Sequence, residues 1–255
     1  MTAALRLALA CGLAGAASLA FAADEDRDEW RFELKRQNTG RGTESESTRT
    51  TLRLEYFPEA GFFSHFRLDV PLPDARTDFS GDPLDPRLGD IKVRASARRI
   101  AAGDGSLLPY VELTFPTADP AELGSGKYQL GLNLSGSVPW QDPPFAPGAH
   151  RIVVGGVLGQ VVSFAGDAAR NDINYTKTEL WLRDSWGEGH VAKVTLKPNI
   201  DWVQDGKTGA VIEVEGSTGI GGGWRVTLMG GHLAWGSGVQ GTYGKRIELT
   251  LSTSF

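Results

Sequence analysis

The sequence predicts an all-β protein: a transmembrane, antiparallel, up-and-down β-barrel of about twelve strands. Three observations support this fold class. Short segments in which apolar and polar residues alternate recur along most of the chain, and this is the period of a β-strand. The segments are even in number, and short and long connections alternate between them, as in outer-membrane barrels. The last segment ends on an aromatic residue, Phe255.

Residues 1–22 have the pattern of a cleavable signal peptide. Arg6 supplies a positive charge, residues 7–20 are apolar and small, and Ala20-Phe21-Ala22 offers a cleavage sequence. A membrane anchor is the alternative, but glycines interrupt the apolar run and acidic residues follow it directly. We therefore expect one β-barrel domain at residues 23–255, exported to the outer membrane of a Gram-negative cell.

Composition excludes several classes of function. Cys11, the only cysteine, lies in the predicted signal peptide, so the exported chain has no thiol for a disulfide, a metal site or catalysis. Without Arg6, 25 of the 26 basic residues remain against 31 acidic ones, about −6 in all, which argues against nucleic acid as a partner. No cofactor or metal is expected, since the histidines lack ligand spacing. The four histidines are His65, His150, His190 and His232.

Twelve alternating segments follow one another after the signal peptide. They lie at residues 30–35, 51–56, 65–70, 91–98, 110–115, 127–134, 152–164, 177–183, 193–201, 210–215, 224–229 and 243–255. Connections at 58–61, 101–106 and 187–189 are short, whereas those at 38–47, 71–88 and 116–126 are longer. The proline-rich stretch 139–148 breaks this alternation, because its position calls for a short turn. The aspartates of 71–88 lack the spacing of a calcium loop, which favours a solvated loop.

The segment at 152–164 differs from the others because both of its faces are apolar, so the pattern does not fix its register. Gly155, Gly156 and Gly159 mark positions where side chains must be absent. In all the other segments one face carries charges, and a membrane barrel directs that face inward. The candidate lumen-lining residues are Arg31, Glu33, Lys35, Arg53, Glu55, Arg67, Asp69, Lys92, Arg94, Arg98, Glu112, Lys177, Glu179, Arg183, Lys193, Lys197, Asp201, Glu213, Glu215, Arg225, Arg246 and Glu248.

A barrel of this size is expected to have a narrow lumen, since eight strands are filled by side chains and sixteen leave a channel. Two interpretations of its mixed charges stay open: a path for a small polar solute, or ion pairs that only brace the interior. Tryptophans near segment ends are typical of interfacial girdles, with packing in a soluble core as the alternative. They are Trp30, Trp140, Trp202, Trp224 and Trp235.

The final segment, residues 243–255, shows most clearly what the barrel predicts. Tyr243, Ile247 and Leu249 share a lipid-facing side, whereas Arg246 and Glu248 face the lumen. Phe255 is then the terminal signal that the barrel-assembly machinery recognises. Outer-membrane lipids and lipopolysaccharide are the other expected partners, together with a small-molecule solute that the sequence does not identify.

Three stretches resemble a known family of outer-membrane barrels. They are Leu-Gly-Asp-Ile at 88–91, Pro-Tyr-Val-Glu-Leu-Thr-Phe-Pro-Thr-Ala at 109–118 and Leu-Gly-Ser-Gly-Lys-Tyr-Gln-Leu-Gly at 123–131. The family is that of the meta-pathway phenol-degradation proteins, also described as transporters. The resemblance implies an outer-membrane barrel that takes up hydrophobic or aromatic compounds, and it carries no substrate residues across.

Two alternatives to a transporter stay open. One is an enzyme at the rim that hydrolyses or deacylates lipids through His232, if a bulge at Gly230-Gly231 turns that side chain; no accompanying serine signature is present. The other is a structural barrel without transport activity. The leading hypothesis is a barrel that passes or binds small molecules through a narrow lumen of mixed charge.

Overall fold

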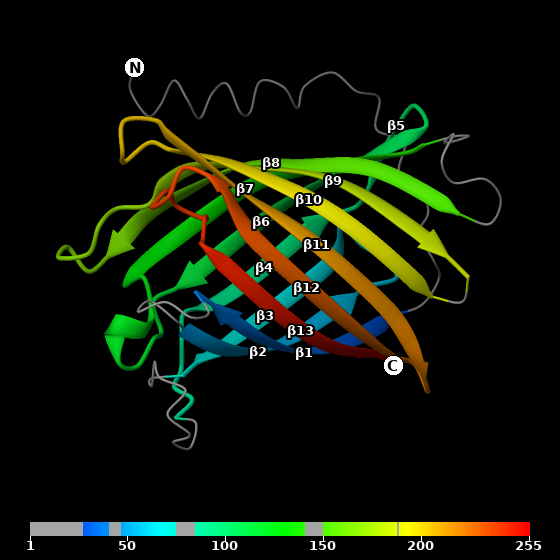
Figure 1. Cartoon of the computed structure of the whole chain (residues 1–255), viewed down its shortest axis with the longest axis horizontal. Coiled ribbons are helices and arrows are strands. Elements are labelled where there is room, and N and C mark those ends of the chain that lie inside the picture. Colours follow the sequence, from blue (N-terminus) through cyan, green and yellow to red (C-terminus); the bar gives the residue numbers. More distant parts are fainter. Residues whose placement is uncertain (1–27, 41–46, 75–84, 141–149, 188) are drawn as a thin grey trace.

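The computed structural model describes residues 28–40, 47–74, 85–140, 150–187 and 189–255. Over these residues, twelve antiparallel strands form a closed barrel, as the alternation predicts (Figure 1). The barrel strands are β1 (Glu29–Thr39), β2 (Ser47–Phe57), β3 (Phe63–Pro73), β4 (Ile91–Ala97), β6 (Gly105–Phe115), β7 (Lys127–Pro139), β8 (Arg151–Gly166), β9 (Asn174–Trp186), β10 (His190–Asp201), β11 (Lys207–Gly221), β12 (Trp224–Trp235) and β13 (Lys245–Ser254). The predicted signal peptide, residues 1–22, lies outside the described residues.

Each strand pairs with its neighbours in the chain, and β1 pairs with β13 to close the sheet. A short additional strand, β5 (Ile100–Ala102), forms a hairpin with the beginning of β6, so β4 pairs directly with β6. A single 3-10 turn, η1 (Ala121–Leu123), is the one helical element in the described chain. No helix in this part of the protein is long and apolar enough to cross a membrane.

The connections divide between two ends of the barrel. At the turn end, on the right in Figure 1, lie the C-terminus and the connections after β2, β4, β7, β9 and β11. At the loop end, on the left, lie the connections after β1, β3, β6, β8, β10 and β12. The stretch between β7 and β8 therefore joins strands at the turn end, and its length is an exception there, as the sequence indicates.

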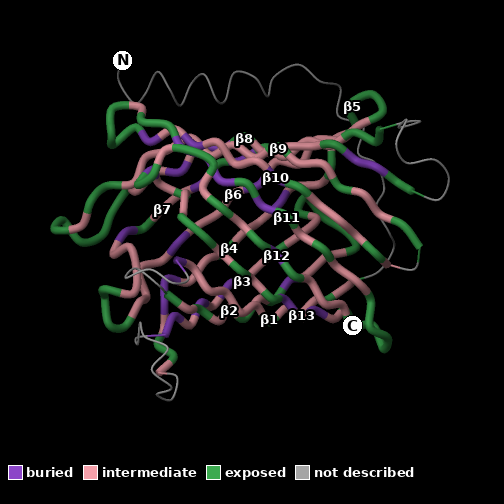
Figure 2. The backbone as a smooth tube through the Cα atoms, viewed as in Figure 1, coloured by how far each residue is buried: buried purple, intermediate pink, exposed green. Residues whose placement is uncertain are grey.

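The two faces of the sheet are inverted relative to a water-soluble protein. Leu158, Val214 and Leu228 on the outer face are 59%, 57% and 56% exposed. On the inner face, the side chains of Arg67 and Asp69 are only 10% and 9% exposed. Figure 2 shows the same alternation along the strands, with no single compact buried core. Apolar side chains out and charged side chains in is the arrangement that a barrel in lipid requires.

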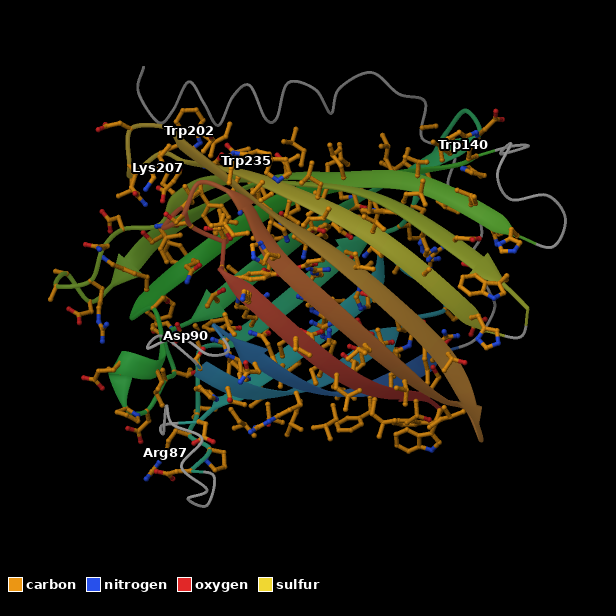
Figure 3. The ribbon with its side chains drawn as sticks, in the orientation of Figure 1. Arg87, Asp90, Trp140, Trp202, Lys207 and Trp235 are labelled. Atoms are coloured by element: carbon orange, nitrogen blue, oxygen red, sulfur yellow. The ribbon has the colours of Figure 1, made fainter. Side chains whose placement is uncertain are left out.

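Aromatic residues gather near both ends. At the turn end the Trp30 and Tyr56 rings stack 4.6 Å apart, and the Tyr56 and Phe66 rings lie 6.4 Å apart. Trp202 and Trp235 lie near the loop end, and Trp140 near the turn end (Figure 3). All five predicted girdle tryptophans are 39% to 46% exposed, which fits side chains that meet a membrane interface better than side chains packed in a core.

The structure also departs from the sequence prediction in two strands. Strand β3 continues through Pro71 and Pro73, which the sequence assigns to a loop; their carbonyl oxygens accept hydrogen bonds from Gly89 and Arg87 at 2.8 and 2.9 Å. Tyr243 is predicted on the lipid face but precedes β13, and its hydroxyl bonds Glu213 inside the barrel. The alternation of a strand does not extend into the connection before it.

Candidate functional site

The candidate functional site is the inner face of the barrel. The pairing registers place one set of predicted lumen residues in inward rows between strands, opposite in direction to the exposed apolar rows. This set is Arg31, Glu33, Lys35, Arg53, Glu55, Arg67, Asp69, Lys92, Arg94, Glu112, Lys177, Glu179, Arg183, Lys193, Lys197, Asp201, Glu213, Glu215, Arg225, Arg246 and Glu248. No described helix or strand crosses the interior, because every described strand belongs to the barrel sheet.

A continuous chain of ion pairs begins on β13 and β1. Lys35 Nζ lies 3.6 Å from carboxylate oxygens of both Glu33 and Glu248. Glu33 also accepts a hydrogen bond from Arg53 Nη1 on β2 at 3.1 Å. Glu33 and Arg53 are directly opposite each other in the register, so the inward rows themselves bring them together.

The chain continues across β2, β3, β6 and β4. Arg53 binds Asp69 through two parallel hydrogen bonds of 2.6 and 3.1 Å, the geometry in which arginine and a carboxylate interact most strongly. Arg67 Nε lies 3.2 Å from Asp69, and Arg67 Nη2 donates to Glu112 at 2.9 Å. Arg94 Nη2 donates to the same oxygen of Glu112 at 2.9 Å. We name Glu248, Lys35, Glu33, Arg53, Asp69, Arg67, Glu112 and Arg94 the charge belt.

Other charges pair in smaller groups. Near the turn end, Glu55 lies 3.7 Å from Arg31 and 3.1 Å from His65. On the opposite side of the barrel, Lys177 lies 3.4 Å from Glu179, and Lys197 lies 2.7 Å from Glu213. The inner face is therefore charged on two sides, and most of its acidic groups are bound to basic neighbours.

Strands β7 and β8 form a neutral wall between the two charged sides. Val153, Val157 and Val161 alternate there with glycines. A Cβ at Gly155 would overlap the Trp181 ring, and one at Gly159 would overlap the Asn133 amide. The glycines thus let the side chains of Trp181 and Asn133 lie against the wall, and this close approach explains why residues without a side chain occur at these positions.

Some inner-face cations near the loop end form no ion pair in the described chain, among them Arg49 on β2, Lys92 on β4 and Arg246 on β13. We name these three the basic cluster. Arg49 is not among the predicted lumen residues, because the predicted alternating segment of apolar and charged residues begins at residue 51. The available signal is its spacing: Arg49 lies four residues before Arg53, on the same face of the strand.

Tyr243 supports the basic cluster from the connection between β12 and β13. Its ring lies 3.6 Å from the Arg246 guanidinium carbon, and its hydroxyl donates a hydrogen bond to Glu213. Burial, together with this bond to a carboxylate, raises the pKa of the Tyr243 phenol well above its usual range. A Cβ at Gly231 would overlap the Tyr243 hydroxyl, so this glycine makes room for the inward tyrosine.

The residues of the family resemblance form an interlocked support at the loop end. Asp90 accepts hydrogen bonds from the Ser125 backbone N–H at 2.6 Å, its hydroxyl at 2.7 Å and the Ala118 N–H at 3.3 Å. Thr117 donates to the Gly89 carbonyl at 2.9 Å. A Cβ at Gly124 would overlap the Asp90 carboxylate. These motif residues therefore join the connections around β4, β6 and β7, and their role here is structural.

An ion pair between a buried lysine and an exposed aspartate ties the next connection to this support. Lys127 Nζ lies 2.9 Å from Asp172, which lies between β8 and β9. The hydrogen bond and charge of Lys127 hold the pKa of the Asp172 carboxyl below its usual range.

Three predicted lumen residues lie close to the turn end. Arg98 lies beyond the end of β4, and it donates at 2.6 Å to the carbonyls of both Gly61 and Glu59 in the β2–β3 connection. Arg225 donates to the Gly189 carbonyl at 2.8 Å and thereby braces the β9–β10 turn. Arg183 is exposed near the end of β9.

His232 is not placed for the catalysis considered as an alternative. It pairs with Ile212 and Lys245 on the outer face, and the β12–β13 register contains no shift that would turn it inward. Its Nδ1 lies 2.6 Å from the Leu233 carbonyl oxygen, and no described serine or carboxylate hydrogen bonds to it. Among the described residues no group of histidine, aspartate and glutamate side chains has the arrangement of a metal site.

Comparison with solved structures identifies similar folds. An outer membrane channel from Pseudomonas putida F1 is 12% identical, with a TM-score of 0.60 over 94% of this chain and 99% of that chain. The NanC porin is 9% identical, with a TM-score of 0.58 over 88% of this chain and 98% of its own. The KdgM porin is 11% identical, with a TM-score of 0.56 over 88% and 99%; a second structure of it contains disordered oligogalacturonate.

No family model and no curated protein matches the sequence. The comparisons therefore establish the fold of outer-membrane channels and porins, whereas membership of the meta-pathway phenol-degradation family is not confirmed.

Proposed function

We propose that the protein is an outer-membrane channel that passes small, water-soluble molecules. The observation that carries this proposal is the inverted barrel: an apolar outer face, a charged inner face, and no described strand or helix across the interior. Water and polar solutes are stabilised by such an interior and excluded by the surrounding lipid. The similar folds are channels and porins, which supports the same function.

Conductance across a planar lipid bilayer tests this function. Purified full-length protein is expected to produce discrete ion currents, smaller than those of sixteen-stranded porins because the lumen is narrower. Protein that has been heat-unfolded in detergent serves as the control and should give no currents. If the folded protein is also silent, and sugar-loaded vesicles containing it do not swell in uptake assays, the structural barrel without transport becomes the better account.

The family resemblance suggests hydrophobic or aromatic solutes, and one feature of the interior supports this finer proposal. The neutral wall places Val153, Val157, Val161 and Trp181 along one side of the lumen. An aromatic ring can contact that side while polar groups meet the charges. Uptake of serine and phenylalanine into vesicles provides the comparison, because both are zwitterions; equal or faster entry of the larger phenylalanine supports an aromatic path.

Membrane insertion completes the proposal. The apolar band contacts outer-membrane lipids and lipopolysaccharide, residues 1–22 direct export, and Phe255 is recognised by the barrel-assembly machinery. Phe255 is 72% exposed and exchanges two backbone hydrogen bonds with Trp30 at the β1–β13 junction. Phe255→Ser should therefore lower the amount of folded barrel in outer-membrane fractions and leave the conductance of each inserted molecule unchanged. Normal amounts of the variant in those fractions would contradict the assembly role.

A further inference from the structure

We propose that Arg49, Lys92 and Arg246 form a binding site for small organic anions at the loop end of the lumen. This inference rests on the proposed channel function and names its preferred class of solute: molecules carrying carboxylate or phosphate groups. These three cations differ from the charge belt because its charges already have partners on the inner face.

The acidic groups nearest Lys92 are bound to other residues. Lys92 lies opposite Asp69 in the β3–β4 register, but Asp69 is held by Arg53 and Arg67. Glu112 on the next strand is held by Arg67 and Arg94. Asp69 and Glu112 thus each have two arginine partners, and Lys92 forms no ion pair in the described chain.

The same holds for Arg49 and Arg246. Asp90 is the acidic group whose charge reaches Arg49, but its two oxygens accept hydrogen bonds from Ala118 and Ser125. Glu248 lies two residues from Arg246 and pairs with Lys35. Asp90 and Glu248 are therefore both engaged by other residues.

Arg49 is the central cation of the three, because β2 lies two strands from β13, which carries Arg246, and two strands from β4, which carries Lys92. The positive charge of Arg246 acts on Arg49, and that of Arg49 acts on Lys92. Three neighbouring cations repel each other, and an anion between them would relieve this repulsion as well as gain charge-assisted hydrogen bonds. A binding site for a negatively charged solute is the arrangement that stabilises such a cluster.

The geometry also holds the site ready. Arg246 is fixed between the Tyr243 ring, 3.6 Å from its guanidinium carbon, and the Thr39 hydroxyl, 3.3 Å from its Nε. Arg49 is exposed near the beginning of β2, and Lys92 is half-buried near the beginning of β4. Arg246 is thus positioned before a solute arrives, which lowers the entropy cost of binding.

Ion selectivity and block by citrate test the site. Full-length protein is placed in a planar bilayer with about 0.1 M KCl on one side, where charges act over about 10 Å, and about tenfold more on the other. The reversal potential should have the sign set by anion permeation. Citrate should block the current. In R49Q/K92Q/R246Q, the citrate concentration that gives half block should rise about tenfold, equivalent to about 1.4 kcal/mol, and the reversal potential should move toward zero.

Lys245→Gln is the matched control. Lys245 precedes Arg246 on β13, is exposed on the outer face, and has the same charge; its loss should leave both readouts unchanged. Arg49→Gln alone removes no contact recorded in the described chain, so it provides a measurable variant if the triple variant does not fold.

The outcomes separate this inference from the channel itself. An absence of all current in the wild-type protein overturns the proposed function. Current without anion preference, or anion preference and citrate block that survive the triple substitution, overturns the anion site and leaves the channel function standing.

Discussion

The charge belt and the basic cluster occupy the same inner face, yet their charges have opposite fates. In the charge belt, Arg53, Arg67 and Arg94 are matched by carboxylates at 2.6 to 3.3 Å. In the basic cluster, Arg49 and Lys92 have no such partner in the described chain. Charged side chains that pair with each other stabilise the barrel wall and bind a solute weakly. Charged side chains without a partner lower the stability of the barrel and can bind a solute of opposite charge. The comparison teaches that lumen charge has to be read pair by pair.

Substitution of the charge belt should produce the largest effect. Glu112→Gln removes the carboxylate shared by Arg67 and Arg94, which leaves Arg94 without a counter-charge in the described chain and Arg67 with Asp69 alone. We expect the free energy of unfolding to fall by about 1–3 kcal/mol, measured by denaturant unfolding in lipid vesicles followed by tryptophan fluorescence. Anion preference should rise, in the direction opposite to the basic-cluster variant.

Glu122→Gln provides the control for this prediction. Glu122 is exposed in η1, so its substitution removes the same charge without opening an ion pair of the belt. It should be close to neutral for stability. Equal destabilisation by the two variants, or a fall in anion preference in Glu112→Gln, would show that the belt is not the neutralised region of the lumen.

The neutral wall offers a comparison that does not involve charge. In Gly155→Ala, the new methyl group would overlap both the Trp181 ring and the Gly136 carbonyl oxygen. Overpacking of this kind costs about 1–3 kcal/mol, and it should displace Trp181 toward the lumen and lower the conductance. Gly216→Ala on β11 is the matched control, because nothing lies within 4 Å of its added Cβ. Similar conductance in both variants would contradict the role of Gly155.

The smallest effect is expected at the pair of Lys127 and Asp172, whose aspartate is exposed to solvent. Because the folded-state pKa of Asp172 is depressed, the pair contributes stability above the unfolded pKa of about 3.9 and loses it as pH falls through the lower folded value. Hydrogen exchange of the β8–β9 connection should therefore increase on acidification into that range. In Asp172→Asn, hydrogen exchange of this connection should already be fast at neutral pH and should change little on acidification. If the variant keeps the pH dependence of the wild-type protein, another titrating group causes that dependence.

Much of the fold was predictable because alternation persists wherever a strand separates lipid from the lumen. It fails at the ends of strands, where both faces meet water. Thr48 and Thr50 point outward on β2 but are polar, so the inward Arg49 between them has no apolar contrast to reveal it. Tyr243 was misplaced for a related reason: it lies in the connection before β13, and the space at Gly231 lets it turn inward.

The sequence by itself determined the class of fold and the two faces of nearly every strand. A period of two and the solvent preferences of side chains are local properties, and they suffice to say that Arg246 points in and Ile247 points out. Only the tertiary structure decided which inward charges neutralise one another. Arg67 and Glu112 are 45 residues apart in the chain and bond at 2.9 Å, because the β3–β4 and β4–β6 registers place both beside Arg94. Coulomb attraction depends on such distances, and so the division between the charge belt and the basic cluster exists only once the barrel has closed.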